Sequence, residues 1–254
     1  MDIETAPMVV YTWRVGRNIN LGHDNIIKEP SIICIGYKWE GKPTKAMWWD
    51  KRNDDKAMLS DFVKIIGQAD EVIAHNGDRF DLPWIRTRCL FHRIPIEAQL
   101  PSVDTLKQAR RGFNFPSNRL DYLGQYMGLG GKRKTSGFDL WKQVYHGDRS
   151  ALRQMVDYCK RDVELLEEVH HTLYTYAKPT AHVGVMEGGY KHWCPSCGSS
   201  HTKLNGNKWT TAGGTVKVQM MCLDCGRTWR MGEATARAEM LREYKAEQAG
   251  KGLA

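Results

Sequence analysis

The sequence predicts an α/β fold, a mixed sheet flanked by helices, followed by a small C-terminal zinc ribbon. Apolar runs rich in β-branched residues alternate with helical patterns between residues 31 and 92. This order of strands and helices after a hairpin indicates a mixed sheet with helices packed on it. Two C-x-x-C pairs near the end of the 254-residue chain predict the ribbon. The length suits one substantial domain and a second, smaller one.

Composition narrows the classes of partner and compartment. The hydrophobic fraction of 41% suits a globular core, and the net charge of +8 favours a polyanionic partner such as nucleic acid. No apolar run approaches the roughly 20 residues needed to span a bilayer, and the N-terminus shows no secretion signal, so we expect no membrane partner. Seven cysteines, four of them in paired spacing, indicate a reducing cytoplasm instead of a disulfide framework.

The chain begins with two carboxylates, Asp2 and Glu4, separated by one residue. If this stretch is extended, the two-residue period places both side chains on one face of a strand. Neighbouring carboxylates repel each other unless they share a cation, so the pair suggests metal ligation, and a solvated acidic terminus is the alternative. Only Met1 precedes the pair, so we expect either an unusually short first strand or a start further upstream.

The next segments supply the sheet and its first helix. Residues 8–13 predict a strand, and residues 31–39 predict a buried strand. A turn over residues 40–43 leads to a hairpin partner over residues 45–49. We expect Asn53 to cap the following helix, which runs to about Gln68.

Residues 72–84 form the stretch around which the rest is organised. A buried strand ends at Asn76-Gly77, and a helix restarts with Asp81 near its N-terminus and continues to about His92. A carboxylate there lies at the mouth of an α/β sheet, where ligands bind at the C-terminal ends of strands.

Residues 102–124 are predicted to be helical and connective. Asp104 is predicted to cap a helix or to support a ligand of the site, and the alternative is a fifth carboxylate of the site itself. The glycine-flanked loop over residues 130–137 carries three consecutive bases, Lys132, Arg133 and Lys134. This loop either is simply solvated or contacts substrate phosphate.

An amphipathic helix is predicted from Ser150 to about Tyr176. Tyr158 and Asp162 lie four residues apart and therefore share one face of it. Asp162 is followed four residues later by Leu166 and not by a base, so a metal ion is a reasonable partner for it.

The C-terminal part divides into a linker over residues 178–190, a zinc ribbon over 191–231 and a charged helical tail over 232–254, which we expect to be solvated. Two cysteine pairs with 24 residues between them fit one tetrahedral structural zinc, with a short β-hairpin between the pairs. The zinc ligands are Cys194, Cys197, Cys222 and Cys225. Six bases and three tryptophans are interleaved there, a pattern suited to nucleic acid, although we expect at least Trp229 to fill the small core.

Three motifs, in order, resemble those of the DEDD superfamily of 3′–5′ exonucleases. They are Asp2-Ile-Glu4-Thr, His75-Asn76-x-x-x-Phe80-Asp81 and Tyr158-x-x-x-Asp162. The tyrosine resembles that of the DEDDy subset, and the residues of the motifs are most similar to those of the proofreading exonuclease domains of family B DNA polymerases. The resemblance covers residues 1–177, without a polymerase domain, and the C-terminal part resembles zinc ribbons of transposases and other nucleic-acid proteins.

This resemblance implies a ribonuclease-H-like fold and two Mg²⁺ or Mn²⁺ ions held by Asp2, Glu4, Asp81 and Asp162. It implies that Tyr158 orients the attacking water and that Asn76 and Phe80 contact the 3′-terminal nucleotide. The expected substrate is nucleic acid with a free 3′ end, DNA favoured, and the expected protein partners belong to replication or repair.

Two alternatives stay open from the sequence. One is a structure-specific endonuclease that uses the same two-metal site, since the loops that enforce action at an end carry no motif. The other is a non-catalytic nucleic-acid-binding module that retains the fold.

Overall fold

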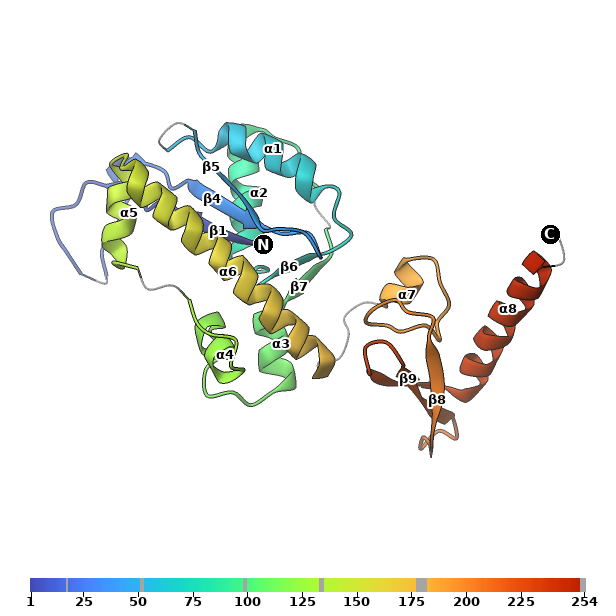
Figure 1. The fold of residues 1–254 in the computed structure, drawn as a ribbon. Helices are drawn as coiled ribbons and strands as arrows, with labels where there is room; N and C mark the ends of the chain where they lie inside the picture. The colour runs from blue at the N-terminus through green and yellow to red at the C-terminus, as the bar shows by residue number, and fades with distance from the viewer. Residues whose placement is uncertain (17, 51–52, 98–99, 133–134, 177–181, 252–254) are drawn as a thin grey trace. The chain divides into compact units, whose positions relative to one another are not determined.

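The computed structural model describes residues 1–16, 18–50, 53–97, 100–132, 135–176 and 182–251. The chain divides into two compact units, Met1–Leu173 and Tyr174–Ala254 (Figure 1). Among the described residues, no helix is both long enough and apolar enough to cross a membrane.

The first unit contains a central antiparallel sheet with the strand order β1-β4-β5. Its strands are β1 (Asp2–Thr5), β4 (Ile32–Tyr37) and β5 (Lys45–Trp48). A parallel pair, β6 (Val72–Ala74) and β7 (Ser102–Asp104), lies next to β1, because the Met1 ammonium group donates to the Ile73 carbonyl at 2.7 Å. Antiparallel and parallel pairs thus occur together, and the predicted α/β class is confirmed.

The predicted hairpin of residues 31–49 is confirmed as β4 and β5, which pair from Cys34 with Trp48 to Tyr37 with Lys45. The strand predicted over residues 8–13 is shorter: β2 (Val9–Val10) pairs with β3 (Ile26–Lys28), which follows the 3-10 turn η1 (His23–Asn25).

Helices cover both faces of the central sheet (Figure 1). One face packs its apolar side chains, such as Ile3, against α1 and α2, and the other packs against α5 and α6. A third cluster joins α3 and α4 to the C-terminal half of α6. The helices are α1 (Lys56–Ile66), α2 (Asp81–His92), α3 (Thr105–Gly112), α4 (Leu120–Tyr126), α5 (Phe138–Tyr145) and α6 (Arg149–Tyr176).

Two local predictions need correction. Helix α1 begins at Lys56 after Asp55, whereas Asn53 has a positive φ of 62° and lies outside the helix. The segment predicted to be only helical and connective begins with the strand β7, whose three residues are too few to show a strand period in the sequence.

Gly36 allows α6 to approach the sheet closely. It lies opposite Asp2 in the β1–β4 ladder, and a Cβ atom there would be 2.9 Å from the Cys159 Sγ and 3.2 Å from the Cys159 carbonyl oxygen. A side chain at this position would therefore push α6 away from β1.

The second unit is built on an antiparallel sheet with the order β10-β9-β8. It contains the short helix α7 (Val183–Met186), β8 (Thr202–Thr210), β9 (Val216–Cys222), β10 (Thr228–Gly232) and α8 (Glu233–Lys251). The hairpin predicted between the cysteine pairs is confirmed as β8 and β9. Residue 177 and residues 178–181 of the expected linker lie outside the described residues.

Helix α8 is not the solvated tail that we expected. Ala236 is fully buried against Val218 and Met220 of β9. Glu243 accepts a hydrogen bond from the Trp193 Nε1 at 2.8 Å and lies 2.7 Å from the His192 Nε2. Ala236 and the partly buried Met240 are its apolar contacts, and Glu233, Glu239 and Glu243 bind the rest of the unit by hydrogen bonds, so the sequence shows no broad apolar stripe.

Candidate active site

Three carboxylates converge between β1 and α6. Asp2 and Glu4 lie on the face of β1 opposite Ile3, as the two-residue period of a strand requires, and Asp162 faces them from α6. One oxygen from each of these side chains lies within 4.8 Å of the others. Residues 160 positions apart are thus brought together by the packing of α6 on the sheet.

Asp81 borders this cluster from the other side of β1. It is the first residue of α2, is 2% exposed, and accepts a hydrogen bond on Oδ1 from the Ile3 backbone N–H at 3.1 Å. It therefore joins the start of α2 to the peptide between Asp2 and Glu4. It is not among the three carboxylates whose oxygens all lie within 4.8 Å of one another.

The carboxylates are difficult to ionise together. Burial raises the pKa of Asp2 to about 8, and repulsion from Asp81 and Asp162 adds to this effect. Burial and the same kind of repulsion, mainly from Asp2, raise the pKa of Glu4 well above its usual range. Burial also raises the pKa of Asp81 to about 6, although the nearby N-terminal ammonium group opposes it. Such a cluster is fully ionised at neutral pH only when additional positive charge binds to it.

Asp162 offers an oxygen for such a cation. Its Oδ2 is ion-paired with Lys132 Nζ, while its Oδ1 is buried without a hydrogen-bond partner among the described residues. An unpartnered buried carboxylate oxygen is costly unless a ligand satisfies it. Carboxylate oxygens are also the donors that Mg²⁺ and Mn²⁺ prefer, so these residues fit a divalent cation.

Lys132 and Tyr158 stand beside Asp162. The Lys132 ammonium group donates to the Tyr158 hydroxyl at 3.3 Å and comes from a loop 30 residues before Asp162. Asp162 thus has a basic partner from a loop, although its own helix supplies none four residues later. Burial and the Asp162 charge raise the pKa of Tyr158 to about 12, so its phenol stays protonated at neutral pH. The other two loop bases, Arg133 and Lys134, lie outside the described residues.

The turn between β6 and α2 holds Asn76 and Phe80. Asn76 has a positive φ of 65°, and its backbone N–H donates to Asp104 Oδ1 at 2.9 Å. The same oxygen accepts from Leu106 and Lys107 N–H groups at the start of α3, as the predicted cap requires. Phe80 directly precedes Asp81 and is 38% exposed, so its ring is accessible to a ligand.

His75 is a positioning residue that our prediction of the site omitted, although it belongs to the second motif. Its ring nitrogens lie 2.9 Å from the Thr105 Oγ1 and 3.0 Å from the Asn118 carbonyl oxygen. Burial lowers the pKa of His75 to about 4, so the ring is neutral and fixes the turn by hydrogen bonds alone.

The four cysteines of the second unit also converge. Their Sγ atoms lie within 4.8 Å of one another, and the Cys194–Cys225 and Cys197–Cys222 Sγ pairs are both 3.6 Å apart. A Zn–S bond of about 2.3 Å gives sulfur separations of about 3.8 Å in a regular tetrahedron, so the set fits zinc. Four protein ligands leave no open position, which is typical of a structural site.

A third group, Asp54, Asp55 and His92, has ligand atoms equally close together. Here the Arg88 guanidinium donates to both Asp55 oxygens at 2.8 Å, and the His92 Nε2 lies 2.6 Å from Asp55 Oδ1. The positive charge that this group needs is therefore part of the fold, and the residues do not fit an additional metal ion.

Residues 27–174 match a family model described as RNase_H superfamily. The matched segment includes Asp81, Tyr158 and Asp162 and begins after Asp2 and Glu4. No curated protein matches the chain.

Proposed function

The chain belongs to the RNase H superfamily, and from this premise we propose that it is a 3′–5′ exonuclease of the DEDDy type that degrades DNA from a free 3′ end. Membership of the superfamily implies a metal-dependent nuclease with nucleic acid as its substrate. The direction of action, the preference for DNA and the roles of individual residues belong to the proposal.

One observation carries this proposal: the oxygens of Asp2, Glu4 and Asp162 lie within 4.8 Å of one another, with Asp81 beside them. We assign these four side chains to hold two Mg²⁺ or Mn²⁺ ions. When bound, such ions activate a water molecule and neutralise the charge that develops on the phosphate and the leaving oxygen.

The other side chains are assigned by what they can donate. Tyr158, protonated at neutral pH, donates a hydrogen bond that orients the attacking water. Lys132 supplies a positive charge for the substrate phosphate, together with Arg133 and Lys134 of the same loop. Asn76 and the exposed ring of Phe80 contact the terminal nucleotide, the ring by stacking on its base.

The zinc ribbon adds affinity for the substrate in this proposal. Lys203, Lys217 and Arg230 are exposed on its strands, and the Arg230 guanidinium lies 4.1 Å from the centroid of the Trp209 ring. Exposed cations beside an aromatic ring suit contacts to the backbone and bases of a single strand. None of the seven cysteines is in a disulfide, which supports the cytoplasm as the compartment. Replication or repair proteins are the proposed partners, because they act on DNA with free 3′ ends.

Digestion of a 5′-labelled single-stranded DNA oligonucleotide tests the activity. With Mg²⁺ or Mn²⁺ we expect a ladder that shortens from the 3′ end. The ladder should be absent with EDTA and with the Asp162→Ala variant. A discrete internal cut would instead support a structure-specific endonuclease. A gel shift without cleavage by folded protein would support a binding module.

Loss of the zinc site tests the role of the ribbon. Cys194→Ser removes one of four ligands and should unfold the ribbon, because zinc binding and folding of such a domain are coupled. We expect weaker binding of single-stranded DNA, with a difference from wild type that shrinks as salt is added. Unchanged affinity at low salt would make the ribbon a protein-interaction module.

A further inference from the structure

A hollow in the first unit lies between the edge strand β5 and helix α6. It has a volume of about 620 Å³, within the range of about 300–1,000 Å³ typical of small-ligand sites. Its lining residues come from the end of β5 and from one face of α6. They are Ala46, Trp48, Trp49, Asp50, Arg149, Leu152, Arg153, Val156, Asp157 and Lys160.

This hollow is separate from the carboxylate site. An α-helix turns by roughly 100° per residue, so Tyr158 points about 180° away from Arg149, nine residues before it. By the same geometry, Lys160 and Asp162 point about 160° apart. The buried stripe of α6 lies between the two faces, so one flank of the helix carries the carboxylate site and the other lines the hollow.

The cations of the hollow are available to a ligand. Arg149, Arg153 and Lys160 make no ion pair with any described residue. The lining contains three cationic and two acidic side chains, so its net formal charge is +1. The cations repeat along one helix face at intervals of four and seven residues and form a row that suits phosphate.

Two consecutive tryptophans give the hollow an aromatic wall. Trp49 is 3% exposed, and its backbone N–H donates to the Ile33 carbonyl at 3.0 Å, which fixes the end of the strand. Trp48 is 50% exposed and lines the hollow, so part of its indole is open to solvent there. Stacking on an exposed indole is independent of sequence, because every base has a π-face.

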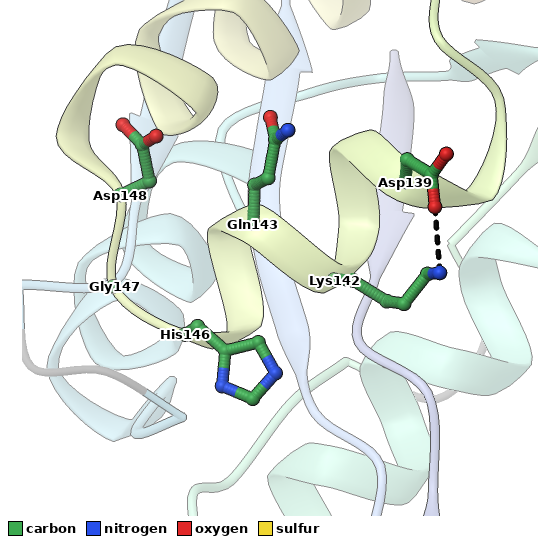
Figure 2. A pocket seen from close by; sticks show the side chains of 6 residues that line it. All are labelled: Asp139, Lys142, Gln143, His146, Gly147 and Asp148. Carbon is green, nitrogen blue, oxygen red and sulfur yellow. Dashed lines mark ion pairs between the residues drawn. The ribbon is translucent and has the colours of Figure 1, made fainter.

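The hollow shown in Figure 2 has neither unpaired cations in a row nor an aromatic wall. Its lining residues are Asp139, Lys142, Gln143, His146, Gly147 and Asp148. Its single lysine is paired with Asp139 at 2.6 Å, as the dashed line marks. The lining contains no tryptophan, tyrosine or phenylalanine, and its net formal charge is −1 with histidine neutral. It therefore lacks the features that would hold a nucleotide.

We propose that this hollow, the groove between β5 and α6, binds a nucleotide. Arg149, Arg153 and Lys160 would contact its phosphate, and Trp48 would stack on its base. This inference rests on the proposed function, because the substrate strand and the released mononucleotide both present this chemistry. Asp157 supplies an acceptor for the sugar hydroxyl or the exocyclic amino group of the base. The groove is a site for a nucleotide that is not undergoing hydrolysis.

Equilibrium binding without added divalent ions tests the groove independently of catalysis. The probes are a deoxynucleoside 5′-monophosphate, an eight-nucleotide single-stranded DNA, and ribose 5-phosphate, which has no base. The variants are Arg149→Ala/Arg153→Ala, Trp48→Ala and Trp48→Phe. The matched control is Lys142→Ala, which removes a cation from the hollow of Figure 2.

We expect Trp48→Ala to weaken binding of at least one of the two base-bearing probes, the monophosphate and the oligonucleotide, by about fivefold to a hundredfold. Trp48→Phe should restore most of this binding. The double arginine variant should weaken it at least as much, whereas Lys142→Ala should not. An effect on the monophosphate identifies the free nucleotide as the ligand, and an effect on the oligonucleotide alone identifies a nucleotide of the strand.

Two results would overturn the groove site. In one, neither probe responds to the Trp48 and arginine variants beyond the Lys142→Ala control. In the other, ribose 5-phosphate binds as tightly as the monophosphate and Trp48→Ala has no effect. Because no readout depends on hydrolysis, these binding measurements test the groove site independently of the proposed exonuclease activity.

Discussion

Two buried acidic clusters of the first unit have similar residues but opposite electrostatics. In the cluster around Asp55, the carboxylate is fully buried and is satisfied by Arg88, by His92 and by the Ile32 backbone N–H at 2.8 Å. In the cluster around Asp2, Lys132 is the cationic side chain paired with Asp162, while the pKa values of Asp2 and Glu4 are raised.

The difference separates a structural cluster from a functional one. Burial alone would raise the pKa of Asp55, but its hydrogen bonds to Arg88, to the Ile32 N–H and to His92 lower it below its ordinary value. The fold therefore neutralises this carboxylate itself. It leaves the other cluster short of positive charge, which is the property that a site for divalent cations needs.

The largest effect is expected from Asp162→Asn. The amide keeps the shape of the side chain but removes its charge, so hydrolysis should fall by a factor on the order of 10³ or more. Thermal unfolding should stay near that of the wild type. Initial rates on labelled DNA, with circular dichroism as the folding control, measure both. Substantial remaining hydrolysis would remove Asp162 from the site.

Asp55→Ala should instead lower the stability of the fold, measured as the free energy of unfolding. It leaves Arg88, which is 6% exposed, without its partner, and breaking a buried pair costs about 3–5 kcal/mol. Urea unfolding at pH 7 measures this loss, and Arg88→Met in the same background should recover part of it. If the single variant were as stable as wild type, the network would not be structural.

The two clusters should also respond oppositely to pH. Asp55 has a lowered pKa in the folded state, so its stabilisation is present above about pH 3.9 and is lost as the pH falls through its folded pKa. Asp2 has a pKa raised to about 8, so it lowers stability progressively as the pH rises from about 4 to 8.

Asp2→Asn tests the second sign. Without added divalent ions, this variant should be more stable than wild type at pH 8, by about 3 °C or more in Tm, and the difference should shrink toward pH 4. Mg²⁺ should stabilise the wild type more than the variant. A variant less stable than wild type at pH 8 would contradict the conclusion that the ionised Asp2 carboxylate destabilises the metal-free fold.

The smallest effect is expected from Tyr158→Phe. It removes one hydroxyl donor beside Asp162, so turnover should slow by about twofold to tenfold, the equivalent of one hydrogen bond. The affinity for Mg²⁺, measured by titration calorimetry, should not change. Unchanged turnover would exclude the hydroxyl from orienting the water.

The sequence predicted the local elements of the site better than its electrostatic environment. The i, i+4 spacing of Tyr158 and Asp162 placed both on one helix face, and the position of Asp81 placed it at the start of α2. The ion pair of Asp162 with Lys132 was not predicted, because it depends on where a distant loop packs. The role of Asp55 was not predicted either, because its partners Ile32, Arg88 and His92 lie 23, 33 and 37 residues away in the chain.

By itself, the sequence determined the α/β class, the three acidic motifs and the paired cysteines, because strand and helix periods and metal-ligand spacings are local properties of the chain. Only the tertiary structure decided which buried carboxylate is fully neutralised by the fold, how closely α6 approaches β4 at Gly36, and that α8 docks on the ribbon. These outcomes depend on contacts between residues far apart in the chain, and such contacts form only when the elements pack together.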